Sequence, residues 1–446
     1  MVRAGNYSAQ RQALLDEASK DRCLAPVQIE AAPGARAVFG TIDDNIVTRG
    51  ASWVTFTNLD VTDTINLVGA SHITLSGIQG GTVYIGGAQH VLIEDSRFGP
   101  CYSGTPVVGD CTTNFKIDSG WQYAVGGPSF TTDGVIVRHN TLADYVNNAN
   151  SHFECMFIRG GENIVIDANV FHVCQHYGIF LQPATAGYDV NTTIENNLFD
   201  ETEDFGMRDN RPGAVDVASD GPAPLTRVLI RFNSFAPYDG VFNEALNDRI
   251  GPGVQVVGNI GGDAWYHPCI GGITYADNLW NGSRCGTTDR VTARLPYVDS
   301  TRGHEDFHLR PHTVADGMVT ADQANLLLGT DFYGNVRPIT AAREPGAIES
   351  QEPPRAITVA VTPDHSASGA VRLVVHGRVR LPAGLPSSYG CTGRVLVVAG
   401  GGEGRGRLEP NCTFLVRVKP SEGDGTLGVA FLGNGYVAPM TVAHTL

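Results

Sequence analysis

The chain has 446 residues, enough for two or three ordinary domains or for one elongated repeat structure with an accessory domain. Its formal net charge is −15 and its only lysines are Lys20, Lys116 and Lys419, so it lacks the basic stripe that nucleic-acid binding requires. No run of about 18 apolar residues occurs, so no membrane-spanning helix is expected. The acidic balance indicates a solvated surface, with cation binding as the alternative.

Residues 8–20 are expected to form a short helix or helical loop. After it, one short pattern recurs along the chain, with apolar residues at i and i+2, usually asparagine at i+5 and a large apolar residue at i+7. The alternation predicts a strand with one buried face, and asparagine suits a tight corner. Weaker copies begin at residues 54, 73, 91 and 254. Five full copies, if threonine is accepted at i, begin at Val135, Ile164, Thr192, Val228 and Ile273.

A coil of about 20 residues cannot bury its own apolar face, so it must stack on its neighbours. The repeat therefore predicts a parallel β-helix. Asparagines at equivalent corners would then form an internal ladder through their side-chain amides, and we interpret them as turn residues and not as ligands. These residues are Asn140, Asn169, Asn197, Asn233, Asn259 and Asn278.

The pattern resembles the right-handed parallel β-helix superfamily that contains pectate lyases and other polysaccharide-acting enzymes. DFHLRPHTVADGM at 306–318 and DFYGNVRPITAAREPGAIE at 331–349 resemble the closing segments of many bacterial secreted β-helix repeat proteins, although His312, Thr313 and Val314 replace the usual small residues. The opening MVRAGNY resembles the end of a coil in that family. The resemblance implies a right-handed parallel β-helix over residues 1–350, a secreted or cell-surface protein whose leader has been removed, and a polysaccharide partner.

Eight of the nine cysteines fall into pairs that are close in sequence, and Cys23 remains over. No C-x-x-C spacing suggests zinc or a redox motif. Disulfides across loops and adjacent coils, formed in an oxidising compartment, are favoured over buried free thiols. The pairs are Cys101 with Cys111, Cys155 with Cys174, Cys269 with Cys285, and Cys391 with Cys412.

A second pattern lies between the asparagine corners, in ECMFIR, HYGIFLQ, DFGMRDN and YDGVFNE. Aligned on Phe157, Ile179, Met207 and Val241, these segments predict four neighbouring strands with those four residues facing inward. Side chains three positions earlier would then point outward in one column, with coils about 4.8 Å apart. That column is Glu154, His176, Asp204 and Tyr238, and Arg208 is also expected to face outward.

Three functions fit this column. Glu154 and Asp204, about 9.6 Å apart across two coils, suit the paired carboxylates of an inverting glycoside hydrolase. Alternatively, His176 or Tyr238 is the base of a uronate lyase and Arg208 neutralises the substrate carboxylate. The family resemblance implies a lysine or arginine as the base of many such lyases, often with Ca²⁺. The only lysine available within the helix is Lys116.

The third possibility is that the column has no chemical role and only keeps the solenoid soluble. The protein would then be a surface or adhesion protein that uses the solenoid as a stalk or a glycan-binding face. His152 and His172 are interpreted as ordinary turn or surface histidines.

The periodicity changes after residues 351–355, QEPPR, which we interpret as a linker. Alternating strands separated by turn residues predict a small antiparallel sandwich over residues 356–446, of immunoglobulin-like type. The glycine-rich segment 399–406 lacks the lysine and the serine or threonine of a phosphate loop, so it is interpreted as a hairpin. The sequence thus predicts a secreted, bacterial-type, carbohydrate-active protein: a lyase or hydrolase of an extended, uronic-acid-containing glycan, with an accessory module.

Overall fold

In the computed structural model, the regular secondary structure of the described residues is β-strand apart from a single short helix, α2 (Ser387–Gly390). The described residues form two compact units, Met1–Leu326 with Ala342–Ile348, and Leu327–Ala341 with Glu349–Leu446. The described residues are 5–6, 26–35, 37–39, 42–43, 52–103, 115–119, 121–122, 129–147, 154–183, 189–200, 213–217, 224–237, 241–242, 250–262, 269, 271–301, 303–310, 312–320, 329–337, 342–350, 355–365, 371–381, 387–420, 426–434 and 437–445.

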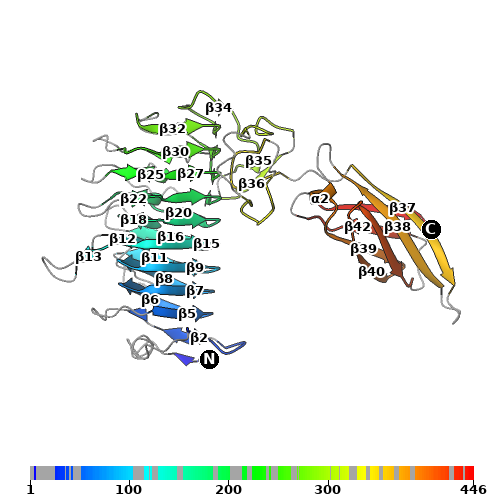
Figure 1. The fold of residues 1–446 in the computed structure, drawn as a ribbon, viewed down its shortest axis with the longest axis horizontal. Helices are drawn as coiled ribbons and strands as arrows, with labels where there is room; N and C mark the ends of the chain where they lie inside the picture. Colours follow the sequence, from blue (N-terminus) through cyan, green and yellow to red (C-terminus); the bar gives the residue numbers. More distant parts are fainter. Residues whose placement is uncertain are drawn as a thin grey trace. The chain divides into compact units, whose positions relative to one another are not determined.

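The first unit is a stack of coils whose strands pair in parallel with the coil above and the coil below (Figure 1). From residue 52 onward, its first sheet is built from the sequence repeats. Each repeat contributes one strand with alternating buried and partly exposed side chains, because one face packs on the core. The sheet is β2 (Val27–Glu30), β5 (Ser52–Thr57), β7 (Ser71–Ser76), β9 (Gln89–Glu94), β15 (Asp133–Arg138), β19 (Val165–Asp167), β23 (Thr193–Glu195), β27 (Leu229–Arg231), β30 (Val254–Val257) and β32 (Ile273–Ala276).

Two further faces close each coil, and the long strands β6 (Asp60–Val68) and β8 (Gln79–Gly86) contribute to both. The second face follows the asparagine corner: β10 (Arg97–Phe98), β16 (Thr141–Asn147), β20 (Val170–Cys174), β24 (Leu198–Asp200), β28 (Ser234–Phe235), β31 (Ile260–Gly261), β33 (Leu279–Trp280) and β34 (Arg290–Val291). The third face is β4 (Ile42–Asp43), β12 (Phe115–Asp118), β17 (Met156–Ile158), β21 (Tyr177–Leu181), β25 (Gly213–Val217) and β29 (Val241–Phe242), beside β6 and β8.

The predicted asparagine ladder is confirmed. Each side-chain Nδ2 donates to Oδ1 of the asparagine in the next coil, at 3.0 Å for every step from Asn140 to Asn278. The same Oδ1 atoms accept backbone N–H groups, so every corner is tied twice. Ser96 and Asp289 take the equivalent places at the two ends of the ladder. All six amides are essentially buried, at 0 to 1% exposed.

The left-handed residue at each corner is the one before the asparagine and not the asparagine itself. The six preceding residues have φ between +50° and +65°, and only one of them is glycine; they are His139, Ala168, Asn196, Phe232, Gly258 and Asp277. Asparagine suits the corner because its side-chain amide both donates and accepts a hydrogen bond, and the preceding residue adopts the unfavourable left-handed conformation of the bend.

The large apolar residue at i+7 fills the core behind the corner. Phe171 stacks on Phe199 at 4.8 Å between ring centroids, and Phe199 contacts Phe235 at 5.0 Å. Phe235 then contacts Trp280 at 6.3 Å. These rings join the aliphatic side chains of all three faces in one continuous core, which supplies the main hydrophobic stabilisation of the unit.

Residues after the last coils cover the outside of the second face. The hydroxyl of Tyr297 lies 2.9 Å from the carbonyl oxygens of both Phe235 and Ile260. Ala347 N–H donates to Oγ of Ser234 at 2.9 Å, and Gly346 lies so close to Ile260 that a side chain there would overlap it. As a result Ser234 and Ile260, which lie on the outer face of strands, are fully buried.

The second unit contains two antiparallel sheets that share one apolar core (Figure 1). One sheet has the order β37 (Ala356–His365), β38 (Val371–Arg380), β41 (Thr413–Val418). The other has the order β40 (Gly402–Arg407), β39 (Arg394–Ala399), β42 (Thr426–Phe431), β43 (Met440–Thr445). The predicted fold class, a parallel β-helix followed by a small antiparallel sandwich, is confirmed.

Three of the predicted disulfides form: Cys155–Cys174, Cys269–Cys285 and Cys391–Cys412. The first joins the start of the third-face strand β17 to the end of the second-face strand β20 in the next coil, and the third ties the start of β41 to the segment before β39. The predictions for Cys111, and so for its pairing with Cys101, and for Cys23 lie outside the described residues. No described helix is long and apolar enough to cross a membrane.

Candidate functional site

The column predicted from the sequence is wrong in its register. Met156, and not Phe157, is level with Ile179, because Phe157 pairs with Phe180. Ile179 continues to Val215 and then to Val241, so the coil between them contributes Val215 where Met207 was expected. The same register sets Glu154 level with Tyr177 and not with His176.

The predicted site residues that the structure describes are both buried, although an outward, exposed position was expected. Glu154 is 3% exposed and His176 is 8% exposed. The His176 ring packs on Tyr177 at 4.0 Å between centroids, and Tyr177 contacts Phe180 at 5.3 Å. Asp204, Arg208 and Tyr238 lie outside the described residues, as does His152.

The observed register aligns a different set of residues on the outer side of the third face. Tyr84 pairs with Lys116, Lys116 with Phe157, and Phe157 with Phe180. The residues on either side of them in their strands are buried in the core, so strand alternation turns these four outward. Two positions further along, Gly86 pairs with Asp118, and Arg159 follows the end of β17 in the adjacent coil.

Four polar side chains meet at this place. Nζ of Lys116 lies 3.5 Å from Oδ2 of Asp118, and Nη1 of Arg159 lies 3.6 Å from the same oxygen. These side chains are only partly accessible: 19% of Lys116, 13% of Asp118 and 37% of Arg159 is exposed. Asp118 therefore holds an amine and a guanidinium side by side on one carboxylate oxygen. We call Tyr84, Lys116, Asp118 and Arg159 the third-face cluster.

Tyr84 reaches Asp118 because it lies across a glycine. A Cβ on Gly86 would be 3.1 Å from Cε1 and 3.2 Å from the hydroxyl of Tyr84, which is tighter than ordinary packing. The strand partner of Gly86 is Asp118, so the phenol is directed at that carboxylate. Burial raises the pKa of Tyr84 to about 12, and the nearby charge of Asp118 and a hydrogen bond to it act in the same direction. The phenol is therefore fully protonated at neutral pH.

Lys116 is in an environment that makes its ammonium group easier to deprotonate. Burial lowers its pKa from the usual 10.5, and the charge of Arg159 lowers it further, while Asp118 opposes both effects. The ammonium lies 5.6 Å from the ring centroid of Tyr84 and 5.8 Å from that of Phe157. Phe157 in turn stacks on Phe180 at 5.0 Å, which extends an aromatic surface towards Tyr177 and His176.

Chemically, the third-face cluster combines a base of lowered pKa, a neutral phenol and a guanidinium. The sequence singled out Lys116 as the only lysine available, but it did not indicate Tyr84, Asp118 or Arg159. The available signal was FKID at 115–118, a short alternating strand with a lysine on its outer face. The sequence does not show which residues of β8 and β17 pair with this strand, because long insertions precede and follow it.

A separate pair occurs on the second face. His172 and Asp200 are level in neighbouring coils, and Nδ1 of the histidine lies 3.0 Å from Oδ2 of the aspartate. This hydrogen bond raises the pKa of His172, and burial opposes the shift. Within the described part of the chain, no group of three or more histidine, cysteine or acidic residues could hold a metal ion.

Comparison with known proteins does not identify a function for this chain. No family model and no curated protein matches the chain. Among solved structures, it is similar to the Streptococcus pneumoniae surface protein and adhesin PfbA, with 13% identity and a TM-score of 0.40, over 60% of this chain and 86% of that one.

It is also similar to the alginate lyase from Paenibacillus sp. str. FPU-7, with 13% identity and a TM-score of 0.38, over 65% of this chain and 95% of that one. At this level of identity, neither neighbour transfers an activity to this chain.

Proposed function

We propose that the protein is a polysaccharide lyase that cleaves a uronic-acid-containing glycan by β-elimination, with the third-face cluster as its active site. The observation that carries the proposal is that Asp118 holds Lys116 and Arg159 side by side, within reach of the neutral phenol of Tyr84. A uronate lyase needs a base for the proton next to the carboxylate, a positive group for that carboxylate, and a donor for the leaving oxygen.

Each of these roles has one residue in the cluster. Lys116, once it has given up a proton to solvent, removes the proton from the carbon beside the uronate carboxylate. Arg159 pairs with that carboxylate and stabilises the negative charge that develops on it. A double bond forms in the sugar ring as the bond to the glycosidic oxygen breaks, and Tyr84 donates its proton to the departing oxygen. Asp118 is a positioning residue, because it orients the other three and does not contact the reacting atoms.

Adjacent residues suit an extended glycan. The partly exposed Phe157 lies beside Lys116 on the same outer face and stacks on the buried Phe180, and successive coils repeat about every 4.8 Å. A sugar ring that stacks on Phe157 would have its polar edge close to the cluster. Glu154 and His176 are buried, and the His176 ring packs on Tyr177, which contacts Phe180, so we assign both residues to the support of this aromatic surface. The roles predicted for Asp204, Arg208 and Tyr238, which lie outside the described residues, stay predictions, and the proposed mechanism does not require them.

The decisive experiment is turnover of a panel of acidic and neutral glycans, followed by the ultraviolet absorbance of unsaturated uronates. Wild type is expected to generate this absorbance on at least one uronate polymer. Lys116→Ala should lower kcat/KM by about 10²- to 10⁴-fold, the usual contribution of a general base. Arg138→Ala is the matched control, because it removes a basic residue from a cross-coil ion pair with Glu94 on the first sheet and should leave turnover unchanged.

Other outcomes select other functions. New reducing ends without unsaturated product would indicate hydrolysis, and would redirect attention to Glu154 and Asp204 as the carboxylate pair. If the whole panel yields neither product, the enzyme proposal fails and a glycan-binding surface protein, the function that does not require catalysis, takes its place.

The two disulfides of the solenoid and the one in the sandwich support an extracellular location in either case. We also assign the sandwich to the immunoglobulin-like modules, because its sheets have the strand orders 1-2-5 and 4-3-6-7.

A further inference from the structure

Charge is divided unequally along the chain. Residues 1–350 contain 22 basic and 40 acidic residues, whereas residues 351–446 contain nine basic and six acidic ones. The C-terminal module is therefore the basic part of a strongly acidic protein. Solubility alone does not require this reversal, since the solenoid already has a large net charge of the opposite sign.

Strand register gathers much of this positive charge on one surface. In β38, exposed Arg372, Arg378 and Arg380 alternate with buried Val375 and Val379. Arg417 of β41 pairs with Val374 of β38, so it lies on the same outer side of the sheet. We call Arg372, Arg378, Arg380 and Arg417 the arginine face.

Little negative charge compensates the arginine face. The only carboxylate in the three strands of this sheet is that of Asp364, which is level with Arg372 at one end. None of the four arginines forms an ion pair with a residue that the structure describes. On the other sheet, by contrast, the exposed Arg405 is paired with Glu403 at 2.6 Å. The guanidinium groups of the arginine face are thus available to an external anion.

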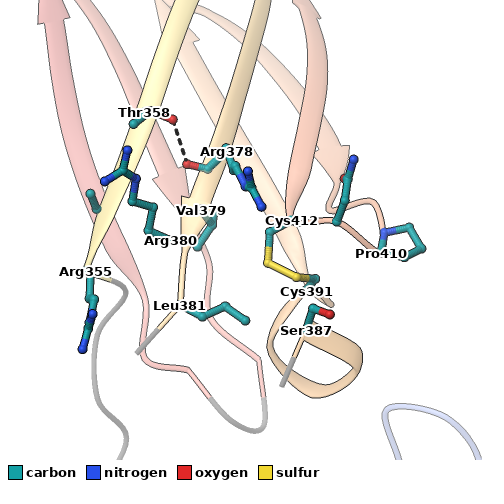
Figure 2. A pocket seen from close by; sticks show the side chains of 12 residues that line it. Arg355, Thr358, Arg378, Val379, Arg380, Leu381, Ser387, Cys391, Pro410 and Cys412 are labelled. Atoms are coloured by element: carbon teal, nitrogen blue, oxygen red, sulfur yellow. Dashed lines mark hydrogen bonds between the residues drawn. A yellow bond between two sulfur atoms is a disulfide. The ribbon is translucent and has the colours of Figure 1, made fainter. Parts of the chain in front are cut away.

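A cavity of about 950 Å³ adjoins one end of this face (Figure 2). Arg355, Arg378 and Arg380 line it, together with the polar side chains of Thr358, Ser387 and Asn411. Figure 2 shows the Cys391–Cys412 disulfide and Pro410 on the side opposite β37. Among the residues that the structure describes, no carboxylate lines the cavity. Guanidinium groups pair with carboxylates in two-pronged geometry, and hydroxyl and amide groups suit sugar hydroxyls.

We propose that the arginine face and this cavity bind an anionic polysaccharide and hold the polymer on the protein independently of the third-face cluster. The choice of a uronate polymer rests on the proposed function. A glycan is favoured over a single-stranded nucleic acid because the outer side of this sheet has no phenylalanine, tyrosine or tryptophan among its described residues and only one imidazole, that of His376, and large aromatic rings are the usual platforms for bases. This module would then recruit the same polymer that the solenoid cleaves.

The test uses the full chain with Lys116→Ala, so that the polymer is bound but not cleaved. Affinity for immobilised polygalacturonate is measured at low and moderate salt, with and without Arg378→Gln and Arg380→Gln together. The matched control is Arg394→Gln with Arg407→Gln, an exposed pair that is level in β39 and β40 on the opposite sheet and removes the same charge. We expect about a tenfold loss of affinity for the first pair, equivalent to about 1.4 kcal/mol, and less than about twofold for the control. Binding should weaken as salt rises.

Equal effects of the two arginine pairs would overturn the proposal, because they would reduce it to a nonspecific charge effect. The proposal would also be overturned if both variants kept the affinity of the parent protein while circular dichroism showed that they were folded. Tighter binding to single-stranded DNA or to phosphatidylserine vesicles than to polygalacturonate would also overturn the assignment to a glycan. Arginine-dependent binding by a protein that cleaves no glycan would refute the proposed lyase and leave this inference intact.

Discussion

Replacing Asn197 by alanine tests whether the asparagine ladder holds the coils in register. Asn197 lies in the middle of the ladder and is fully buried. Its Nδ2 donates to Oδ1 of Asn233 at 3.0 Å and to the carbonyl of Ile166 at 2.8 Å. Its Oδ1 accepts the backbone N–H of Asn169 at 2.9 Å and the Nδ2 of Asn169 at 3.0 Å. Alanine removes all four hydrogen bonds and leaves buried partners without replacement.

The expected cost follows from this count. At about 1 kcal/mol for each buried hydrogen bond, Asn197→Ala should lower the free energy of unfolding by about 4 kcal/mol. Asn197→Ser should cost less, because Ser96 already serves at the equivalent position, where its Oγ accepts the N–H of Ile78 at 2.9 Å. The control is Asn191→Ala in the same coil. Asn191 is exposed and donates one hydrogen bond, to Asn163, so a loss of about 1–2 kcal/mol is expected, including left-handed strain.

Urea unfolding followed by circular dichroism measures these differences, with the slope of the transition checked for each variant. A lower slope for Asn197→Ala would mean that the solenoid unfolds in two parts at the broken corner, which a repeat structure allows. If Asn197→Ala is no less stable than Asn191→Ala, the ladder does not set the stability of the coils, and core packing alone must do so.

The remaining predictions concern the two polar sites of the solenoid. Gly86→Ala should push Tyr84 away from Asp118 and lower lyase turnover by about tenfold to a hundredfold without unfolding the protein. The control is Gly271→Ala, where the added Cβ meets open space, and it should leave turnover unchanged. Equal turnover in the two variants would refute the role of Tyr84. His172 has a pKa raised above 6.5 by Asp200, so its hydrogen bond should stabilise the fold fully below about pH 6.5 and lose this effect as the pH rises through the folded-state pKa. The stability difference between wild type and His172→Gln should accordingly shrink towards alkaline pH, and a difference that is independent of pH would exclude the ion pair as its cause.

The repeat made most of the solenoid predictable. Alternating apolar residues, asparagine at i+5 and a large side chain at i+7 each correspond to one feature of the structure: a first-sheet strand, a ladder position and a ring in the core. Val91 shows how far the pattern extends, because its copy lacks asparagine but has Ser96 at the same corner. The copies that begin at 54 and 73 have Leu59 and Ile78 there, both fully buried, so their corners pack without a ladder amide.

The candidate site could not be placed from the sequence because the third face has apolar residues on both sides. Every residue of β21, Tyr177–Leu181, is buried, and the outward Phe180 is as apolar as the inward Ile179. A period-two pattern then no longer distinguishes the faces, and a shift of one residue exchanges them. That shift is what misplaced Phe157. Insertions of unequal length between the asparagine corners also concealed which segment of the next coil supplies Val215.

The ladder also has a consequence for how such a protein can change. Its steps join residues 29, 28, 36, 26 and 19 positions apart, yet each step has the same 3.0 Å amide contact. The geometry of each asparagine corner, which we call a joint, therefore does not depend on the number of residues between two corners. Segments between joints can be lengthened, shortened or exchanged without moving the neighbouring coils. The third face, whose strands lie in those variable segments, is therefore the part of the solenoid that is free to acquire new specificities, and loop grafting between asparagine corners should be the most tolerant way to redesign it.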